Sequence, residues 1–268
     1  MFERIASALE RIAPPVPIPT DWLSYPAYVW SGSRVQPIAA LETTPLAQLR
    51  GIEPQKSAVT ENLARLAAGA AAHDMLLWGA RGMGKSALVR ASVQALQAEQ
   101  PHPLALVQIA PGALTDFPAL IGQLGEQPRT FLLFIDDLGF GADDTQDNLA
   151  LRSLLDGSVI ARPANIRLAV TSNRRAIVRR DSEENAPLHE RDERDNALAL
   201  ADRFGLTLGF HPCDRVTYLA ILRGYTDPLG LSVNEEEALA WALARGNRSG
   251  RTAWQFACEL AGRAGLSL

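Results

Sequence analysis

The stretch Gly79-Ala80-Arg81-Gly82-Met83-Gly84-Lys85-Ser86 decides the fold of this 268-residue chain. It matches the phosphate-binding pattern G-x-x-x-x-G-K-[ST] at every fixed position. The apolar run at 75–78 before it predicts a short buried strand, and residues 87–99 after it predict a helix. A strand, a glycine-rich loop and a helix in this order are the context in which the pattern binds phosphate.

The chemistry of this loop follows from its geometry. Glycines allow successive backbone N–H groups to turn toward a phosphate, and the N-terminus of the following helix adds partial positive charge. We therefore expect residues 79–86 and Ala87 to bind phosphate, Lys85 to reach the β- and γ-phosphates, and Ser86 to ligate Mg²⁺. A chance match is a weak alternative, because the chain contains only two lysines, Lys56 and Lys85. The sequence thus predicts a protein that binds a nucleoside triphosphate.

The composition narrows the class of protein further. Hydrophobic residues make up 47% of the chain and charged residues 21%, which is typical of a globular protein. A net charge of −4 gives no global basic field that would favour nucleic acid or an anionic membrane. The two cysteines, Cys213 and Cys258, form neither a disulfide framework nor a metal-ligand pattern. The chain has no apolar run of membrane-spanning length and no apolar signal segment at its N-terminus, so we expect a cytoplasmic protein without membrane insertion.

Residues 1–50 predict an N-terminal segment that precedes the main domain. Apolar residues at helical spacing favour a helix over 2–12, and four prolines at 14–19 then end it and extend the chain. An aromatic group follows: Trp22, Tyr25, Tyr28 and Trp30. We expect these rings to pack on the main core, and a surface that docks a partner or another subunit is the alternative.

Residues 51–212 predict an α/β domain and residues 213–268 a small helical domain. Short apolar runs at 75–79, 104–109, 131–135, 166–171 and 205–210 are separated by helical stretches at 86–99, 116–124 and 146–156, with a further helix at 55–69. This alternation favours a parallel five-stranded sheet with helices on both faces. The mixed-charge stretch 174–196 predicts a solvated loop, or else a moving element that touches a substrate or a neighbouring subunit. Three helices are expected beyond it, at 215–225, 234–245 and 251–262.

A second nucleotide signature lies about 50 residues after the first. The apolar strand at 131–135 ends in Asp136-Asp137. In a parallel sheet this puts carboxylates at the carboxyl edge, where ligands sit. We expect Asp136 to hold the metal through water, and Asp137 to orient or deprotonate the attacking water.

Three polar groups then follow in sequence order. The strand at 166–171 ends in Ser172-Asn173, which places an amide at the same sheet edge. Ala201-Asp202-Arg203-Phe204-Gly205 precedes the fifth strand, and Gly246-Asn247-Arg248-Ser249-Gly250-Arg251 opens the last helix.

This order of motifs resembles the AAA+ ATPases over about residues 45–265, with the three C-terminal helices as their lid. The resemblance implies that Asn173 is the first sensor and that Arg203 is a finger reaching a neighbouring subunit's γ-phosphate. It also implies that Arg251 is the second sensor, and Arg248 is the alternative for this role. Within Leu49-Arg50-Gly51-Ile52, the resemblance implies Ile52 as the apolar contact of adenine.

Two finer resemblances narrow the family. Asp136-Asp137-Leu138-Gly139 looks like the variant found in replication initiators and helicase loaders. The chain is also similar to a bacterial family of predicted P-loop ATPases of unknown function. The shared strings are Leu76-Leu77-Trp78-Gly79-Ala80-Arg81-Gly82, Thr171-Ser172-Asn173-Arg174-Arg175, Asp202-Arg203-Phe204-Gly205 and Arg248-Ser249-Gly250-Arg251.

The sequence therefore predicts an ATPase that converts ATP to ADP and phosphate with Mg²⁺. We expect it to assemble as a homo-oligomer and to remodel or load an unknown protein or nucleic-acid partner. An alternative is an ATP-dependent switch that hydrolyses slowly or not at all and docks on its partner through residues 1–50. A small-molecule kinase is less favoured, because no acceptor-binding lid is evident between the phosphate loop and the acidic strand.

Overall fold

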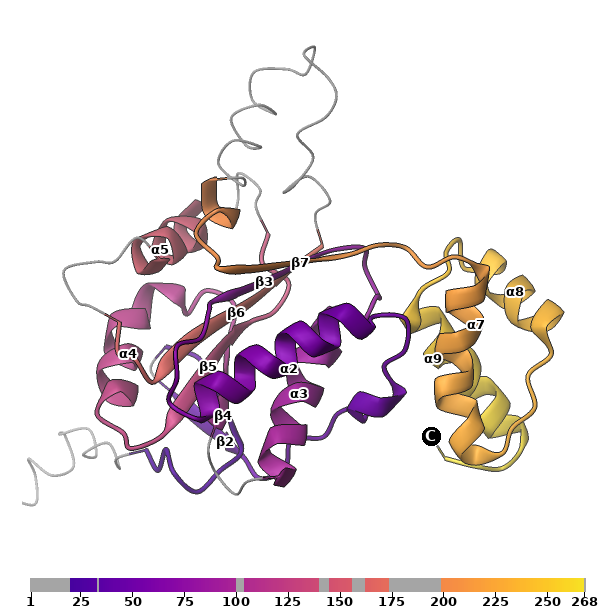
Figure 1. The fold of residues 1–268 in the computed structure, drawn as a ribbon, viewed down its shortest axis with the longest axis horizontal. Coiled ribbons are helices and arrows are strands. Elements are labelled where there is room, and N and C mark those ends of the chain that lie inside the picture. Colours follow the sequence, from indigo (N-terminus) through magenta and orange to yellow (C-terminus); the bar gives the residue numbers. More distant parts are fainter. Residues whose placement is uncertain are drawn as a thin grey trace, which may run out of the picture.

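The computed structural model describes residues 20–32, 34–99, 104–139, 145–155, 162–173 and 199–267, and every structural statement concerns these residues (Figure 1). The helix expected over 2–12 and the charged stretch 174–196 lie outside them. No helix of the described ranges is long and apolar enough to cross a membrane.

The described strands form one seven-stranded sheet rather than the predicted five-stranded one. Its strand order is β2-β1-β4-β5-β6-β3-β7, and every neighbouring pair is parallel except β1 with β2. The strands are β1 (Ala27–Trp30), β2 (Val35–Ile38), β3 (Met75–Gly79), β4 (Leu104–Ile109), β5 (Thr130–Ile135), β6 (Ile166–Ser172) and β7 (Leu206–Phe210). The last five lie within a residue of the apolar runs, so the predicted parallel core is confirmed.

The strand count was wrong because β1 and β2 come from the aromatic segment ahead of residue 51. β1 pairs in parallel with the open edge of β4, with Ala27 opposite Leu106. β2 continues the sheet as an antiparallel edge strand that contains Pro37. A proline has no N–H to donate and is tolerated at an edge. β1 is a four-residue apolar run that was interpreted as part of the aromatic group rather than as a strand, and β2 contains a glutamine and a proline, so neither strand was predicted.

Helices cover both faces of the sheet, as predicted. Those that accompany it are α2 (Glu53–Ala67), α3 (Lys85–Glu99), α4 (Phe117–Gly125) and α5 (Thr145–Leu155), with 3₁₀ turns η1 (Leu46–Gln48) and η2 (Leu114–Asp116). Alternate residues of β5 face opposite sides, since Leu132 and Phe134 belong to the core under α2 and α3, and Leu133 to the core under α4 and α5. Figure 1 shows α2 and α3 over one face.

The aromatic segment packs on the second of these cores. Trp22, Tyr28 and Trp30 are each at most 3% exposed. The ring centroid of Trp22 lies 4.8 Å from that of Tyr28 and 6.1 Å from that of Phe131 in β5. The guanidinium of Arg129 donates to the Trp22, Leu23 and Tyr25 carbonyls, which fixes the backbone of the segment. The expectation that these rings pack on the main core is confirmed.

Three helices follow β7, as predicted. They are α7 (Arg215–Thr226), α8 (Glu235–Ala244) and α9 (Gly250–Arg263), with the turn η5 (Asp227–Leu229), and they lie beyond the carboxyl end of β7 (Figure 1). Asp214, Asn234 and Ser249 cap their N-termini by accepting from backbone N–H groups. The role of this C-terminal bundle as a lid stays a prediction.

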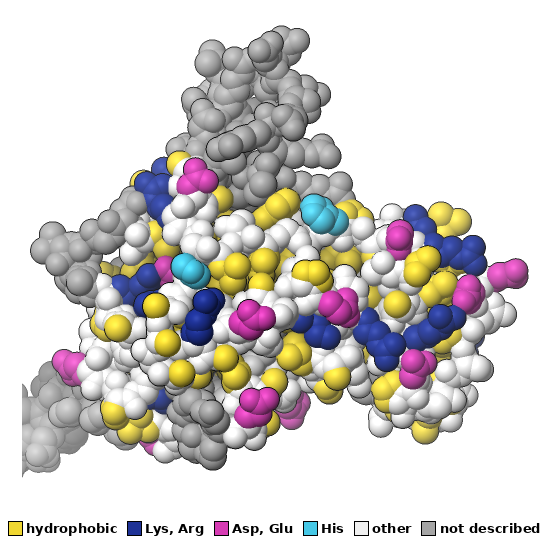
Figure 2. Space-filling view, in the orientation of Figure 1, with side chains coloured by type: hydrophobic (Ala, Val, Ile, Leu, Met, Phe, Trp, Pro, Cys, Tyr) yellow, Lys and Arg dark blue, Asp and Glu magenta, His cyan; other side chains and the backbone are white. Residues whose placement is uncertain are grey.

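Charges of both signs are interspersed over the C-terminal bundle in Figure 2. Glu235 accepts from Arg215 at 3.3 Å and from Arg223 at 2.7 Å, which ties α7 to the start of α8. Arg263 of α9 reaches Glu237 of α8 at 2.6 Å. Because these pairs are exposed, each adds little to stability. They leave no large field of one sign on this face of the bundle.

Candidate active site

The predicted phosphate loop connects β3 to α3. Its first residue, Gly79, has a φ of 118°, a backbone conformation that favours glycine. A Cβ atom there would lie 2.1 Å from the carbonyl oxygen of Phe210 in β7, so no larger residue fits. The next N–H, from Ala80, donates to that same carbonyl at 2.7 Å. The start of the loop therefore packs tightly against the end of β7.

The start of α9 docks directly on this loop. The Arg251 N–H donates to the Gly82 carbonyl at 3.0 Å. A Cβ atom on Gly82 would lie 3.0 Å from the Ser249 hydroxyl oxygen and equally close to the Arg251 Cβ. Ser249 and Thr252 form a reciprocal capping box, which fixes where α9 begins. Two parts of the chain that are far apart in sequence are thus joined at the loop.

Lys85 is buried at the first position of α3, with 6% of its surface exposed. Its Nζ donates to the Gly79 carbonyl at 3.0 Å, the Ala80 carbonyl at 2.9 Å and the Asn173 Oδ1 at 2.8 Å. All three acceptors are neutral, and burial lowers the pKa of Lys85 to about 8. Asp137 and Asp136 oppose this pKa shift, while Arg251 and Arg81 add to it.

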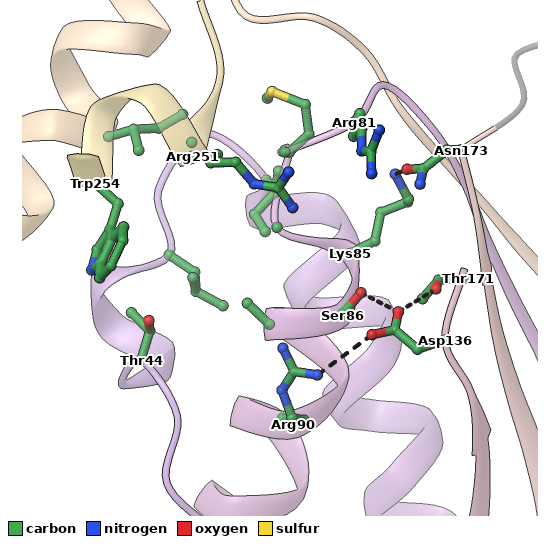
Figure 3. A pocket seen from close by; sticks show the side chains of 18 of the residues that line it. Thr44, Arg81, Lys85, Ser86, Arg90, Asp136, Thr171, Asn173, Arg251 and Trp254 are labelled. Carbon is green, nitrogen blue, oxygen red and sulfur yellow. Dashed lines mark hydrogen bonds and ion pairs between the residues drawn. The ribbon is translucent and has the colours of Figure 1, made fainter. Parts of the chain in front are cut away.

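Asp136 lies where β5 ends and gathers hydroxyl groups from two other elements. Its Oδ1 accepts from the Ser86 hydroxyl at 2.5 Å and from the Thr171 hydroxyl at 2.7 Å. Its Oδ2 lies 3.7 Å from the guanidinium of Arg90, one turn further along α3 (Figure 3). The carboxylate thus joins the phosphate loop to the ends of β5 and β6.

Asp137 adopts a left-handed backbone conformation, with a φ of 58°. Its N–H donates to the Thr171 hydroxyl oxygen at 2.8 Å, and its Oδ1 accepts from the side-chain amide of Asn173. Such a φ is uncommon for a non-glycine residue and tends to occur at functional sites. Asn173 therefore bridges the Lys85 ammonium and the Asp137 carboxylate.

These groups line one cavity of about 420 Å³, a size typical of small-molecule sites. Its polar end holds Lys85, Ser86 and the two aspartates (Figure 3). The predicted site residues that line it are Ile52, Arg81, Gly82, Met83, Gly84, Lys85, Ser86, Ala87, Asp136, Asp137, Asn173 and Arg251. Gly79 and Ala80 contribute the carbonyls that hold Lys85. Arg248, the open alternative to Arg251, is not among the lining residues.

Arg203 lies apart from this cavity. It lines a separate hollow of about 520 Å³ together with Arg162, Arg167, His73 and Asp74. That hollow lies at the amino ends of β3, β6 and β7, the opposite edge of the sheet from the phosphate loop. The Arg203 guanidinium donates to the Ala199 carbonyl. The structure thus brings the other predicted site residues together and leaves Arg203 out.

Nine lining residues were not predicted as site residues: Thr44, Leu49, Arg50, Arg90, Thr171, Ile221, Tyr225, Gly250 and Trp254. Arg90 follows Ser86 by four residues on one helix and Thr171 precedes Asn173 by two in an extended segment, so regular periodicity places both on the site side. Trp254 follows Arg251 by three residues, which is also one helix face. Nothing in the sequence pointed to Thr44.

The chain belongs to the family described as "Protein of unknown function (DUF815)". The family's profile matches residues 23–264, most of the chain. No curated protein matches the chain.

Solved structures share the fold. Two variants of RuvB from Thermotoga maritima superpose with TM-scores of 0.52 and 0.53, each at 17% identity over 84% of this chain and 68% of the other. The Aeropyrum pernix ORC1 protein, solved in complex with DNA, gives a TM-score of 0.56 at 15% identity, over 85% of this chain and 66% of the other. At these identities the likeness shows the fold alone.

Proposed function

We propose that this protein binds ATP with Mg²⁺ in the cavity at the phosphate loop and hydrolyses it to ADP and phosphate. The observation that carries the proposal is the state of Lys85. Burial disfavours its charge, and its three hydrogen-bond acceptors are neutral. No ion pair of Lys85 is found within the described ranges. A phosphate chain would supply the negative charge that this ammonium lacks.

The residues at the polar end fit a magnesium ion. Mg²⁺ prefers oxygen ligands and binds through one or two protein oxygens together with phosphates and water. Ser86 and Asp136 offer a hydroxyl and a carboxylate that already contact each other, and no group of three or more His, Cys, Asp or Glu side chains that could hold a metal occurs in the described residues. These two residues would hold the ion, which when bound neutralises charge on the phosphate oxygens.

Asp137 and Asn173 are the candidates for positioning the attacking water. Their contact lies beside Lys85, where the terminal phosphate would bind. A carboxylate there can accept a proton from water, and the amide can orient it. In the proposal Arg251 adds a second cation from α9, and Ile52 contacts the adenine base.

The position of Arg203 favours a homo-oligomer. An arginine at the opposite edge of the sheet lines no part of its own subunit's cavity. In our proposal it stabilises the transition state in a neighbouring subunit, so that residues of two copies form each active site. The C-terminal bundle then acts as a lid that senses the nucleotide, and the cycle remodels or loads a partner, protein or nucleic acid.

A slow ATP-dependent switch is the second candidate. One observation favours it: Oδ1 of Asp137 already accepts from the side-chain amide of Asn173, which competes with water for that oxygen. The two candidates differ in turnover and share ATP binding. The rate of single-turnover ATP hydrolysis, measured with protein in excess over ATP, distinguishes them. It is measured at a protein concentration where the chain is monomeric and at one where it assembles.

ATP binding is tested with the chain's two lysines as a matched pair. Lys85→Ala should remove most of the ATP affinity in a calorimetric titration with Mg²⁺, since it deletes the cation fixed in the loop. Lys56→Ala is the control, because Lys56 donates to the Leu49 carbonyl outside the loop. Parent-like binding by Lys85→Ala would contradict the assignment of the site.

A further inference from the structure

One end of the cavity lies away from the phosphate loop. Trp254 lines it there, opposite Thr44 (Figure 3). With 46% of its surface exposed, Trp254 is the one aromatic side chain among the large hydrophobic residues that the structure describes as exposed. Because this partly exposed indole also lines the cavity, its apolar ring is available to a ligand that binds there.

The helix α9 sets the distance of this ring from the loop. Its buried stripe consists of Thr252, Ala253, Phe256, Ala257 and Ala261. Arg251 and Trp254 lie three residues apart on the other side, so their side chains share one face. The Arg251 N–H is bonded to Gly82, and a helix rises about 1.5 Å per residue. Trp254 therefore lines the same cavity roughly one turn away from the phosphate loop.

Two tryptophans of the C-terminal bundle provide an internal contrast. The ring of Trp241 in α8 packs on Phe256, with centroids 5.3 Å apart, and carries the Arg245 guanidinium 3.3 Å from its centroid. Trp254 has no such ring partner and no hydrogen bond within the described part of the chain. Trp241 is held by its own bundle, whereas the ring of Trp254 is open to the cavity.

We propose that Trp254 stacks on the base of the bound nucleotide and is the principal affinity determinant at the nucleoside end. This inference rests on the proposed function. A triphosphate bound at Lys85 directs its nucleoside along the cavity, toward the side lined by Ile52, Thr44 and Trp254. Aromatic stacking recognises the π-face that every base has, so this contact tolerates a change of base. The ring thus provides affinity and leaves the choice between adenine and guanine to polar groups.

The test compares ligands with and without a base. ATP, GTP and inorganic tripolyphosphate, each with Mg²⁺, are titrated calorimetrically into the full chain and into Trp254→Leu, Trp254→Phe and Trp241→Leu. Trp254→Leu should weaken ATP and GTP about tenfold or more, by similar factors, since base stacking typically contributes that much. Tripolyphosphate affinity should stay the same, and Trp254→Phe should recover most of the loss. Trp241→Leu, which removes the same ring elsewhere in the bundle, should bind all three ligands like the parent.

Fluorescence gives a second readout that does not depend on affinity. Binding of ATP should change the tryptophan emission of the parent, and the change should vanish in Trp254→Phe and persist in Trp241→Phe. Thermal unfolding of each variant checks that it is folded, which is expected because Trp254 is exposed.

Different failures lead to different conclusions. Equal losses for ATP and tripolyphosphate in Trp254→Leu would mean that the ring positions α9 on the loop, and unchanged ATP affinity would mean that it does not touch the base. Either result overturns the stacking. If the parent binds neither ATP nor tripolyphosphate, or if Lys85→Ala binds both like the parent, the proposed function fails and the inference fails with it.

Discussion

At the carboxyl edge of the sheet the charged side chains are held largely by neutral partners, whereas at the amino edge Asp74 is paired with an opposite charge. Lys85 rests on carbonyl and amide oxygens, and Asp136 on two hydroxyl groups, with Arg90 more distant. At the other edge, Asp74 accepts from the Leu168 N–H at 2.8 Å and from Arg162 at 2.5 Å.

Arg167, also at the amino edge, is only partly buried and donates to backbone carbonyls. Its Nε donates to the Ala72 carbonyl and its Nη1 to the Ile166 carbonyl, each at 2.6 Å. A charge paired with an opposite charge, as Asp74 is with Arg162, stabilises the fold and has little left to offer a ligand. A buried charge left on neutral partners, as Lys85 is, costs stability and keeps its capacity for an opposite charge. The comparison teaches which charges serve the fold and which serve a ligand.

Arg203, which lies at the amino edge, carries the largest expected effect. If it acts on a neighbouring subunit, Arg203→Ala should leave ATP affinity nearly intact and lower turnover about a thousandfold or more. Mixing it with Lys85→Ala should restore part of the turnover, because intact pockets of the first variant then face intact arginines of the second. The measurement is steady-state phosphate release from each variant and from their mixture.

The mixture experiment needs proof of subunit exchange, obtained by native mass measurement with ATP. With exchange shown, a mixture as inactive as its parts would make Arg203 a structural residue of the amino edge. A protein that stays monomeric at every ATP concentration would favour the switch over the oligomeric ATPase.

Within the carboxyl edge, Asp136 and Asp137 should have different roles. Asp137→Asn should leave ATP bound and slow hydrolysis by about a hundredfold or more, the size of a lost general base. Asp136→Asn should instead weaken nucleotide binding that depends on Mg²⁺, because Asp136 is the residue in contact with Ser86. ATP affinity at several Mg²⁺ concentrations, together with single-turnover rates, distinguishes them. Equal losses of affinity in both variants would contradict the division of roles.

Substitutions at the amino edge should instead change the stability of the fold. Asp74 is 8% exposed, and Asp74→Asn leaves Arg162 with a poorly compensated charge. We expect a loss of about 3 kcal/mol in the free energy of unfolding, the lower end of the range for breaking a buried pair. Lys85→Met should not destabilise the fold, because it removes a charge that burial disfavours. Denaturant unfolding measures both, and a larger loss in Lys85→Met would reverse the comparison.

Much of the carboxyl edge could be predicted from the sequence because its signals are local. A strand followed by G-x-x-x-x-G-K-S and an apolar strand followed by Asp136-Asp137 each fit in a short window. Parallel strands bring such windows to one edge without any knowledge of packing. Arg90 and Thr171 lay within reach of the same reasoning, since helix and strand periods place them beside Ser86 and Asn173.

The remainder depends on contacts between distant parts of the chain. The bond from Arg251 to Gly82 places α9, and no local pattern shows which turn of a helix meets a loop. β1 and β2 are short strands added beside β4, and β1 pairs only because that side of β4 is otherwise open. The partners of Asp74 could not be read from the sequence either, because Leu168 and Arg162 reach it only once β3 and β6 are paired.

The smallest effect is a pH dependence that comes from Lys85 alone. Its pKa of about 8 lies below the 10.5 of an unperturbed lysine, so the free protein loses this proton as the pH rises through 8. A bound phosphate chain favours the charged form, and ATP affinity should therefore fall above pH 8, by at most about tenfold per pH unit for one linked proton. Stability should move the other way: between pH 8 and 10.5 the unfolded chain binds more protons at this residue, so the contribution of Lys85 to stability rises with pH. Titrations from pH 7 to pH 9.5 in buffers of different ionisation enthalpy measure both the affinity and the proton uptake. Lys85→Arg is the control, because its guanidinium keeps its charge throughout this range. An ATP affinity as flat in the parent as in Lys85→Arg would show that the ammonium is not held on neutral partners in solution, and the contrast between the two edges would then lose its clearest sign.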